Sequence, residues 1–414
     1  MEIICQGKQL GKTASISGRL TILENIDDLK MVKKGDIIFF GERLDNSDTF
    51  YMTFNCIENG AFGFIRLGGG SNDHGSIVAK EIGINYLKVD NDLSQYRNKK
   101  ISLHENKVLI GEKEFSKNSI DYKKPDASIK IKLNMSFFGI NKSFKNILGY
   151  TDGVGFSRFE FILVQILNGY HPIEFVKRFG EEHLIDNITK LIMPVAKELK
   201  LQGKEFWIRT DDFTSNDLYS MLGGKEYEVY EQVTSAGYRG IRRSIVDKKI
   251  VNLQFKAVSK LIGVGIDNIK IFPPMTNSIS EFNIWKEIGN SHNIPDKSYG
   301  LMVETPRSAF MIEEFLDQIN FVVFGTNDLT QFLLAADRNN SKLSNIFDEE
   351  DEFVTKAISN VILKCKEKNI ETFVGGNAAT NINFIKKLVD CGLTGVSVVP
   401  DESIVSELKC EFQI

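Results

Sequence analysis

The sequence predicts an α/β protein in which a small mixed β/α domain is followed by a (β/α)8 TIM barrel. In residues 1–111, short apolar segments bounded by glycine and charged residues predict strands and turns. From Ser128 onward, short apolar segments alternate with long stretches of helical periodicity, which is typical of a parallel sheet with helical crossovers. The length of 414 residues is too great for one ordinary domain and agrees with this division.

The first domain, residues 1–111, is expected to contain several short strands and one helix. The helix follows a run of glycines and carries His74 in its first turn. The predicted strands are Ile37–Phe40, Gly63–Leu67, Tyr86–Val89 and Lys107–Gly111.

Residues 112–127 are predicted to be a linker. They are mostly polar, with Phe115 and Ile120 as isolated apolar residues, and Pro125 lies near the end of the segment.

The second domain, residues 128–414, is expected to form the barrel, because eight apolar strands alternate with helices. Residues Phe255–Leu261 and Ala309–Phe315 are examples of segments with helical spacing. The eight predicted strands are Ile129–Asn134, Gly153–Arg158, Glu205–Arg209, Asn268–Pro273, Tyr299–Glu304, Phe321–Thr326, Thr372–Gly376 and Gly395–Val399.

Composition excludes several classes of protein. The net charge of −4 gives no broad basic surface for nucleic acid. No apolar run approaches the ~18 residues that span a membrane, and the N-terminal residues do not form a secretory signal. The five cysteines are odd in number and scattered, with no metal-binding spacing. We therefore expect a cytoplasmic protein with free thiols.

His74 lies in a glycine-rich stretch that runs from Gly68 to Ile84, and the chain has only five histidines. A helix N-terminus presents unpaired N–H groups and a partial positive charge, so it binds anions. An imidazole at this position is well placed to carry a phosphoryl group. The alternative is a glycine turn with an incidental surface histidine, since short glycine patterns are weak motifs.

The active site of such a barrel lies at the carboxyl ends of its strands. Arginines that follow these strands can hold carboxylate and phosphate groups in bidentate geometry. A Glu and an Asp from neighbouring strands provide oxygen ligands for Mg²⁺. Together they favour a small phosphorylated acid and phosphoryl transfer. The polar residues at these ends are Arg158, Glu160, Arg209–Asp212, the segment Gly237–Arg243, Glu304–Arg307 and Gly325–Asp328.

Each of these residues also has a structural interpretation. Arg158 and Glu160 could form an ion pair, and Glu304 could accept a hydrogen bond from a backbone amide. Asn327 and Asp328 could cap the helix that follows them.

Several blocks of sequence resemble the family of phosphoenolpyruvate synthase and pyruvate phosphate dikinase, with Enzyme I of the sugar phosphotransferase system as a more distant relative. The resemblance covers nearly the whole chain. The matching blocks are Thr13–Gly18, the His74 segment, Asp152–Phe161, Arg209–Asn216, Gly237–Gly240, Val303–Pro306, Gly325–Gln331 and Asp337–Arg338.

The resemblance implies that residues 1–111 are a swivelling phosphohistidine domain and that His74 is the phosphoryl carrier. It implies a barrel that binds phosphoenolpyruvate (PEP) or pyruvate, with Mg²⁺ held by Glu304 and Asp328. It also implies that the phosphate and carboxylate groups are gripped by Arg158, Arg209 and Arg239, with Asn327 beside them.

Three departures from the family pattern affect the prediction. The sequence has no ATP-grasp domain, so we expect a separate ATP-grasp protein to supply the phosphate, unless the carrier is loaded backwards from the barrel. Gly375 occupies the position of the family's proton-donating cysteine, which puts carbon protonation in doubt. Asn72 and Asp73 replace the small residues that usually precede the histidine.

We therefore expect a phosphotransferase in which phosphorylated His74 exchanges its phosphoryl group with a small carboxylic acid in a Mg²⁺-dependent barrel site. The acid is like pyruvate or PEP, or presents a hydroxyl or amide acceptor. One alternative is a split phosphoenolpyruvate synthase, and another is a barrel that only binds PEP and signals to a partner. A homodimer is expected by analogy with related barrels.

Overall fold

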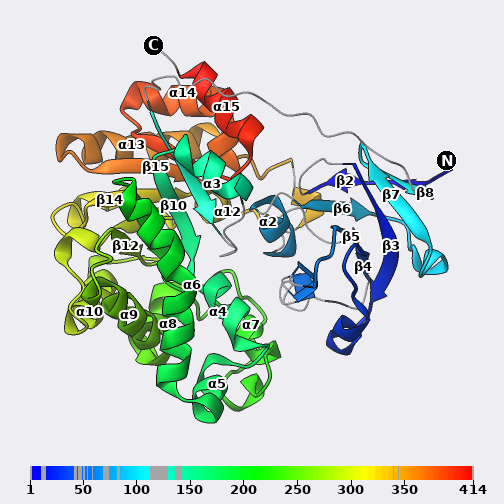
Figure 1. Ribbon diagram of the computed structural model, residues 1–414. Helices are drawn as coiled ribbons and strands as arrows, with labels where there is room; N and C mark the ends of the chain where they lie inside the picture. Colours follow the sequence, from blue (N-terminus) through cyan, green and yellow to red (C-terminus); the bar gives the residue numbers. More distant parts are fainter. Residues whose placement is uncertain are drawn as a thin grey trace. The chain divides into compact units, whose positions relative to one another are not determined.

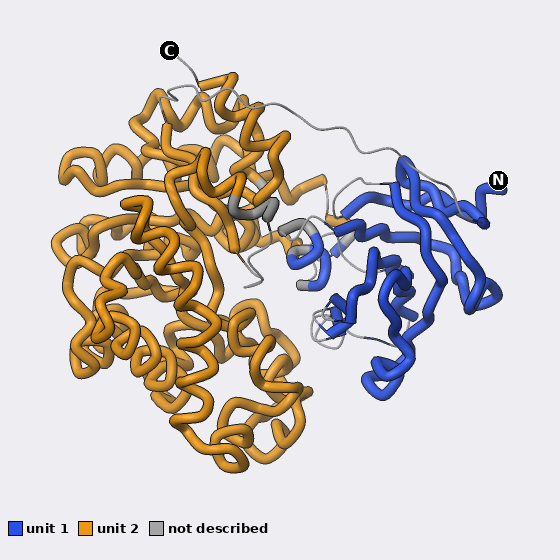
Figure 2. The backbone as a smooth tube through the Cα atoms, in the orientation of Figure 1, with its two compact units in different colours: residues 1–123, 339–341 blue, residues 124–338, 342–414 orange. Residues whose placement is uncertain are grey.

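The computed structural model divides into two compact units (Figure 2), residues 1–123 with 339–341 and residues 124–338 with 342–414. The predicted linker, residues 13 and 14 of the first matching block and residues 69–73 before His74 lie outside the described residues. The described residues are 2–10, 15–41, 44, 49, 52–53, 55–57, 59–68, 74–81, 84–111, 129–135, 142–338, 340–343 and 345–412.

The first unit is built on a mixed sheet of eight strands in the order β1-β8-β7-β3-β4-β5-β6-β2. The central strands β3 to β6 run parallel, and β1, β2, β7 and β8 join them in antiparallel pairs. The strands are β1 (Ile3–Gln6), β2 (Lys8–Gln9), β3 (Ile16–Leu23), β4 (Ile37–Phe40), β5 (Gly63–Leu67), β6 (Asn85–Val89), β7 (Lys100–His104) and β8 (Lys107–Ile110).

Both faces of this sheet are covered, which explains its continuous apolar strands. In β4, Ile37 and Phe39 pack into one core, and Ile38 and Phe40 pack into the other. The helical segments with described bounds are η1 (Ile26–Met31), α2 (His74–Glu81) and η2 (Ser94–Tyr96), and residues 49, 52–53 and 55–57 are also helical.

The described part of α2 begins at His74. Because the residues before it lie outside the described residues, the position of His74 in the first turn stays a prediction. Gly68, directly after β5, has φ +64°, a conformation that glycine adopts without strain. The side chain of His74 lies outside the described residues.

The second unit contains eight parallel strands in the order β12-β11-β10-β9-β16-β15-β14-β13. A parallel bridge between Ile271 and Tyr299 links the two ends of this sheet, so the strands form a nearly closed barrel surrounded by helices (Figure 1). All eight predicted strands are confirmed, and their ends differ from the predicted ends by at most two residues. The strands are β9 (Lys130–Met135), β10 (Gly153–Arg158), β11 (Glu205–Arg209), β12 (Ile269–Phe272), β13 (Leu301–Val303), β14 (Phe321–Gly325), β15 (Glu371–Gly375) and β16 (Gly395–Val398).

Helices connect these strands. The α-helices are α3 (Lys142–Gly149), α4 (Phe159–Leu167), α5 (Pro172–Phe179), α6 (Glu181–Leu201), α7 (Ser215–Ser220), α8 (Gly240–Val246), α9 (Lys248–Gly263), α10 (Ile279–Ser291), α11 (Pro306–Phe310), α12 (Thr326–Leu334), α13 (Glu352–Glu367), α14 (Ile382–Cys391) and α15 (Glu402–Glu411). Short 3-10 segments are η3 (Gly224–Glu226), η4 (Asp296–Ser298), η5 (Ile312–Glu314), η6 (Ser341–Leu343) and η7 (Asn377–Thr380).

One predicted helix differs from the structure. Phe255–Leu261 lies within α9, as expected, but Ala309–Phe315 is divided between α11 and η5. The apolar spacing arises because both short segments bury side chains, with Ala309, Ile312 and Phe315 all in the core.

The barrel interior is packed with large side chains. Phe156, Trp207, Phe272, Met302 and Phe373 belong to one buried cluster. Side chains alternate along a strand, so residues two positions apart lie on the same face. Arg158, Arg209 and Gly375 follow Phe156, Trp207 and Phe373 by two positions and therefore lie on the interior face at the carboxyl ends of their strands. Among the described residues, no helix is long and apolar enough to cross a membrane.

Candidate active site

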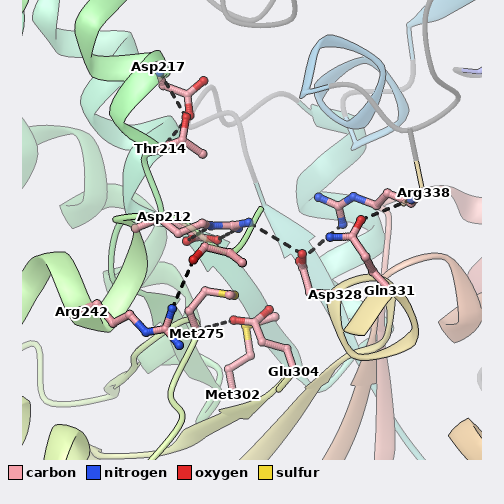
Figure 3. A network of polar contacts seen from close by, with 12 residues as sticks. Asp212, Thr214, Asp217, Arg242, Met275, Met302, Glu304, Asp328, Gln331 and Arg338 are labelled. Atoms are coloured by element: carbon pink, nitrogen blue, oxygen red, sulfur yellow. Dashed lines mark hydrogen bonds and ion pairs between the residues drawn. The ribbon is translucent and has the colours of Figure 1, made fainter. Parts of the chain in front are cut away.

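Charged side chains from several elements meet at the carboxyl ends of the barrel strands (Figure 3). Arg209 ends β11, Glu304 follows β13, and Asp328 lies in the first turn of α12 after β14. Arg239 is the N-cap residue of α8. All four side chains are buried.

Asp212 holds two of the arginines. Its carboxylate accepts hydrogen bonds from Arg239 Nε at 2.9 Å and Nη2 at 2.5 Å, a bidentate pair. Arg209 Nη1 lies 3.2 Å from Asp212 Oδ2, and Arg209 Nη2 donates to Glu160. This arrangement fixes the orientation of both guanidinium groups.

Both arginines carry a stable positive charge. Burial lowers the pKa of Arg239, but the carboxylates of Asp212 and Asp328 outweigh burial and raise the pKa well above its usual value. For Arg209, burial also lowers the pKa, and Glu160 and Asp212 raise it further than burial lowers it. Arg209 Nε has no hydrogen-bond partner among the described residues. A buried donor of this kind can bind an anionic ligand.

Glu304 is fully buried, with 0% of its surface exposed. Its Oε1 accepts a hydrogen bond from the backbone N–H of Met275 at 2.5 Å, so the expected alternative role is present. Its other oxygen, Oε2, is buried without a hydrogen-bond partner in the described part of the chain. Burial raises the pKa of Glu304 to about 8, and the charges of Asp328 and Asp212 also raise it. A bound cation would stabilise the charged form.

Asp328, like Glu304, is buried and has one carboxylate oxygen without a hydrogen-bond partner among the described residues. Its Oδ2 lies 3.4 Å from Arg338 Nη1, and its Oδ1 lies 3.7 Å from Arg239 Nη1. Oδ1 accepts no hydrogen bond from any described residue, and neither does the side-chain oxygen of Asn327. The sequence prediction of a cap is therefore not borne out for the side chain of Asp328, since the N-cap residue of α12 is Gly325 and makes no side-chain cap bond.

The two carboxylates fit Mg²⁺ by their chemistry. Glu304 Oε2 and Asp328 Oδ1 are buried oxygens that accept no hydrogen bond within the described part of the chain, which suits oxygen ligands of a hard cation. The described residues contain no cluster of three or more metal-binding side chains. Mg²⁺ commonly uses one or two carboxylates together with water and substrate oxygens, so this pair is a sufficient protein contribution.

Arg158 ends β10 and has a different environment. Its guanidinium lies 4.5 Å from the ring centre of Phe156 and 5.0 Å from that of Phe161. The sequence also allowed an ion pair between Arg158 and Glu160, but in the structure Glu160 accepts a hydrogen bond from Arg209. The Arg158 guanidinium therefore lies against two aromatic rings at the edge of the group of charged residues.

The segment before α8 is held so that Arg239 reaches the site. Arg243 donates to Glu228 at 2.7 Å and to the carbonyl of Tyr238 at 3.0 Å. Gly240 has φ +58°, and a Cβ atom there would lie 2.9 Å from the carbonyl oxygen of Pro274. Only glycine fits this turn without strain.

Arg158, Arg209, Arg239, Glu304, Asn327 and Asp328 lie at the carboxyl ends of the barrel strands, where the sequence predicts them. The sequence assigned no role to Asp212, which binds the Arg239 guanidinium, or to Arg243, which binds the carbonyl of the preceding residue, Tyr238. The available signal for Asp212 was its position directly after the end of β11. His74 belongs to the other unit.

Comparisons with known proteins all find similarity to enzymes that use or make phosphoenolpyruvate. The family described as "PEP-utilising enzyme, PEP-binding domain" matches residues 113–410. The chain is 29% identical over 97% of its length to "Probable phosphoenolpyruvate synthase" of Pyrococcus abyssi, and 29% identical over 97% to "Phosphoenolpyruvate synthase" of Pyrococcus furiosus. A "Phosphoenolpyruvate synthase" of Helicobacter pylori is 27% identical over 97% of the chain. The chain covers 50%, 50% and 52% of these three relatives, so it spans about half of their length.

Proposed function

Because the chain belongs to the PEP-utilising enzymes, through their PEP-binding domain, we propose that it is a phosphotransferase component that works through a phosphohistidine. In this proposal His74 carries a phosphoryl group and exchanges it with a small carboxylic acid bound at the barrel mouth. The acid resembles PEP or pyruvate, or presents a hydroxyl or amide acceptor.

The observation that carries the proposal is the pair of buried guanidinium groups held by Asp212. Arg239 is oriented by a bidentate contact, and Arg209 Nε has no hydrogen-bond partner among the residues that the structure describes. Arginines fixed in this way bind carboxylate and phosphate without further reorganisation. Arg158 and Asn327 border the same strand ends and are proposed to contact the acid.

Mg²⁺ is the proposed cofactor, with Glu304 and Asp328 as its protein ligands. When bound, it would neutralise charge on the phosphoryl and enolate oxygens. Glu304 would hold the deprotonated form that the cation requires, and the Met275 N–H fixes the direction of the carboxylate.

The phosphoryl group is proposed to reach His74 from a separate ATP-grasp protein. A split phosphoenolpyruvate synthase is a second candidate. It is favoured by the relatives with that name, which match the chain over 97% of its length. The two candidates share the phosphohistidine and differ in whether the acid exchanges a proton at carbon.

The test is to incubate the chain with ³²P-labelled PEP and Mg²⁺ and to measure acid-labile label on the protein. The expected result is one labelled site that disappears in His74→Ala. The matched control is His183→Ala, which removes an exposed histidine from α6 and should label normally. Label that survives in His74→Ala would refute the carrier role. PEP binding without any label in the wild-type protein would instead favour a sensor.

A further inference from the structure

Met275 has a backbone conformation that is rare for its residue type. It follows Pro274 shortly after the end of β12 and has φ +58°, in the left-handed region. Residues with a Cβ atom seldom adopt this region, and glycine or asparagine usually occupies it after a proline in a turn. Residues in such conformations persist only where the surrounding contacts hold them, and they concentrate at functional sites.

Contacts on both sides of Met275 hold its turn in place. The carbonyl of Pro274 accepts a hydrogen bond from the N–H of Ile241 in α8 at 3.0 Å. The carbonyl of Thr276 accepts one from the hydroxyl of Thr305, the N-cap residue of α11, at 2.7 Å. The turn is therefore tied to two helices, and these contacts offset the unfavourable conformation of Met275.

One peptide group in this turn joins α8 to Glu304. Its oxygen, on Pro274, accepts from Ile241, and its N–H, on Met275, donates to Glu304 Oε1 at 2.5 Å. Type I and type II β-turns differ by a flip of their central peptide group, with φ negative or positive after it. The proline and the positive φ after it match type II. A negative φ at Met275 would therefore turn the N–H away from Glu304 and the carbonyl oxygen toward it.

The side chain of Met275 is also part of the packing. Only 2% of the residue is exposed. A Cβ atom on Gly240 would lie 2.9 Å from Met275 Cβ, so the absence of a side chain at Gly240 leaves room for the methionine. The side chain therefore contributes packing, whereas the backbone conformation is unfavourable for a residue of this type.

We propose that Met275 is a positioning residue for the cation that Glu304 binds. Its left-handed conformation directs the N–H to Oε1, and the carboxylate then presents Oε2 to the metal, a buried oxygen that accepts no hydrogen bond from the described residues. The inference rests on the proposed Mg²⁺ site and extends it, because it assigns part of the metal affinity to the backbone of a residue that provides no ligand. Groups that orient a metal ligand commonly contribute about 10–100-fold to affinity.

The experiment measures the Kd of the whole chain for Mn²⁺, a paramagnetic substitute for Mg²⁺, by electron paramagnetic resonance. Met275→Leu and Met275→Ile are compared, because the two side chains are isomers and only the β-branched isoleucine strongly disfavours positive φ. Met275→Leu should bind Mn²⁺ within about twofold of the wild-type protein, and Met275→Ile about 10–100-fold more weakly. The matched control is Met311→Ile, at an exposed methionine with φ −108°, which should bind as the wild-type protein does.

Met275→Asn separates positioning from stability. Asparagine is several-fold enriched in the left-handed region, but it is smaller than methionine and polar, so this variant should have a lower Tm than the wild-type protein. It should nevertheless bind Mn²⁺ more tightly than Met275→Ile. A merely structural role would make the affinity follow the Tm across the three variants, and that result would overturn the inference.

Two results distinguish this inference from the proposed function. If the wild-type protein binds Mn²⁺ and the folded Met275→Ile and Met275→Leu variants bind it equally well, the inference is wrong and the proposed site stands. If the wild-type protein does not bind Mn²⁺, the proposed Mg²⁺ site is wrong and the inference fails with it. The carrier role of His74 is tested independently by the labelling experiment.

Discussion

Gly325 and Gly375 are directly paired at the ends of β14 and β15, yet alanine should have opposite effects at the two positions. A Cβ atom on Gly325 would lie 2.6 Å from Glu304 Oε2 and 2.8 Å from Glu304 Cβ. A Cβ atom on Gly375 would meet its nearest neighbours at 3.5 and 3.6 Å, which is ordinary van der Waals contact. Gly325 has φ −90°, so backbone strain does not contribute to the difference.

The cost of Gly325→Ala follows from this contact. The Cβ atom of Glu304 is tied to its backbone and cannot rotate away, so β13 and β14 must separate or Glu304 must shift. Overpacking of this kind costs about 1–3 kcal/mol. For a domain of this size that corresponds to a fall in Tm of roughly 2–10 °C.

The same shift should affect function more than stability. Glu304 would lose its alignment with the Met275 N–H and its direction toward the proposed metal. Misplacement of a catalytic group by about 1 Å can cost ~100-fold in rate. We therefore expect Gly325→Ala to lower Mg²⁺-dependent labelling of His74 from PEP by at least tenfold.

The assay compares thermal unfolding and labelling for both variants under the same conditions. Gly375→Ala should unfold at the wild-type temperature or slightly above it, because alanine restricts the unfolded chain. Equal Tm values and equal labelling for the two alanine variants would refute the argument that Glu304 is positioned by the absence of a side chain at 325.

Three further predictions follow from the same cluster. Asp212→Asn should lower the free energy of unfolding in urea by about 3–5 kcal/mol, because it leaves two buried guanidinium groups without their shared carboxylate. The control Asp217→Asn should lower it by only ~1 kcal/mol, through the N-terminal cap of α7. Similar losses in the two variants would contradict the role given to Asp212. Burial raises the pKa of Glu304 to about 8, above the ordinary value near 4.5, so the folded state binds this proton more tightly than the unfolded state. The free energy of unfolding should therefore fall as pH rises from about 5 to 8, and Glu304→Gln should flatten this pH dependence. An unchanged pH dependence in Glu304→Gln would contradict the raised pKa of Glu304. Gly375→Cys should fold normally because a Cβ atom fits there. It should also raise deuterium exchange into the methyl group of pyruvate above the wild-type rate, since it adds an acid at a strand end where Gly375 has no side chain. An unchanged exchange rate in a folded, pyruvate-binding variant would show that position 375 does not face the substrate carbon.

The barrel strands could be predicted because parallel strands are buried on both faces and appear as short apolar runs. Strands such as Gly153–Arg158 and Glu205–Arg209 match their predicted bounds, and the polar residue at each end marked the site. The same logic placed Glu304 and Asp328 together without a structure.

Other features depend on three-dimensional contacts that have no local signal. The contact between the segment that carries Glu349 and Thr326 joins residues 23 positions apart, and nothing in the sequence around Glu349 predicts it. The contact of Asp212 with both Arg209 and Arg239 likewise depends on the path of the loop before α8, which the sequence does not predict. The absence of a side chain at Gly375 was visible in the sequence, but the close pairing of Gly375 with Gly325 was not.

The most direct test of the central claim is a crystal structure of the protein with PEP and Mn²⁺, which takes the place of Mg²⁺ and is located by its anomalous scattering. We predict one metal peak bound to Glu304 and Asp328, with the carboxylate and phosphate groups of PEP held by Arg209 and Arg239. A metal peak elsewhere, or PEP bound away from these arginines, would contradict the account.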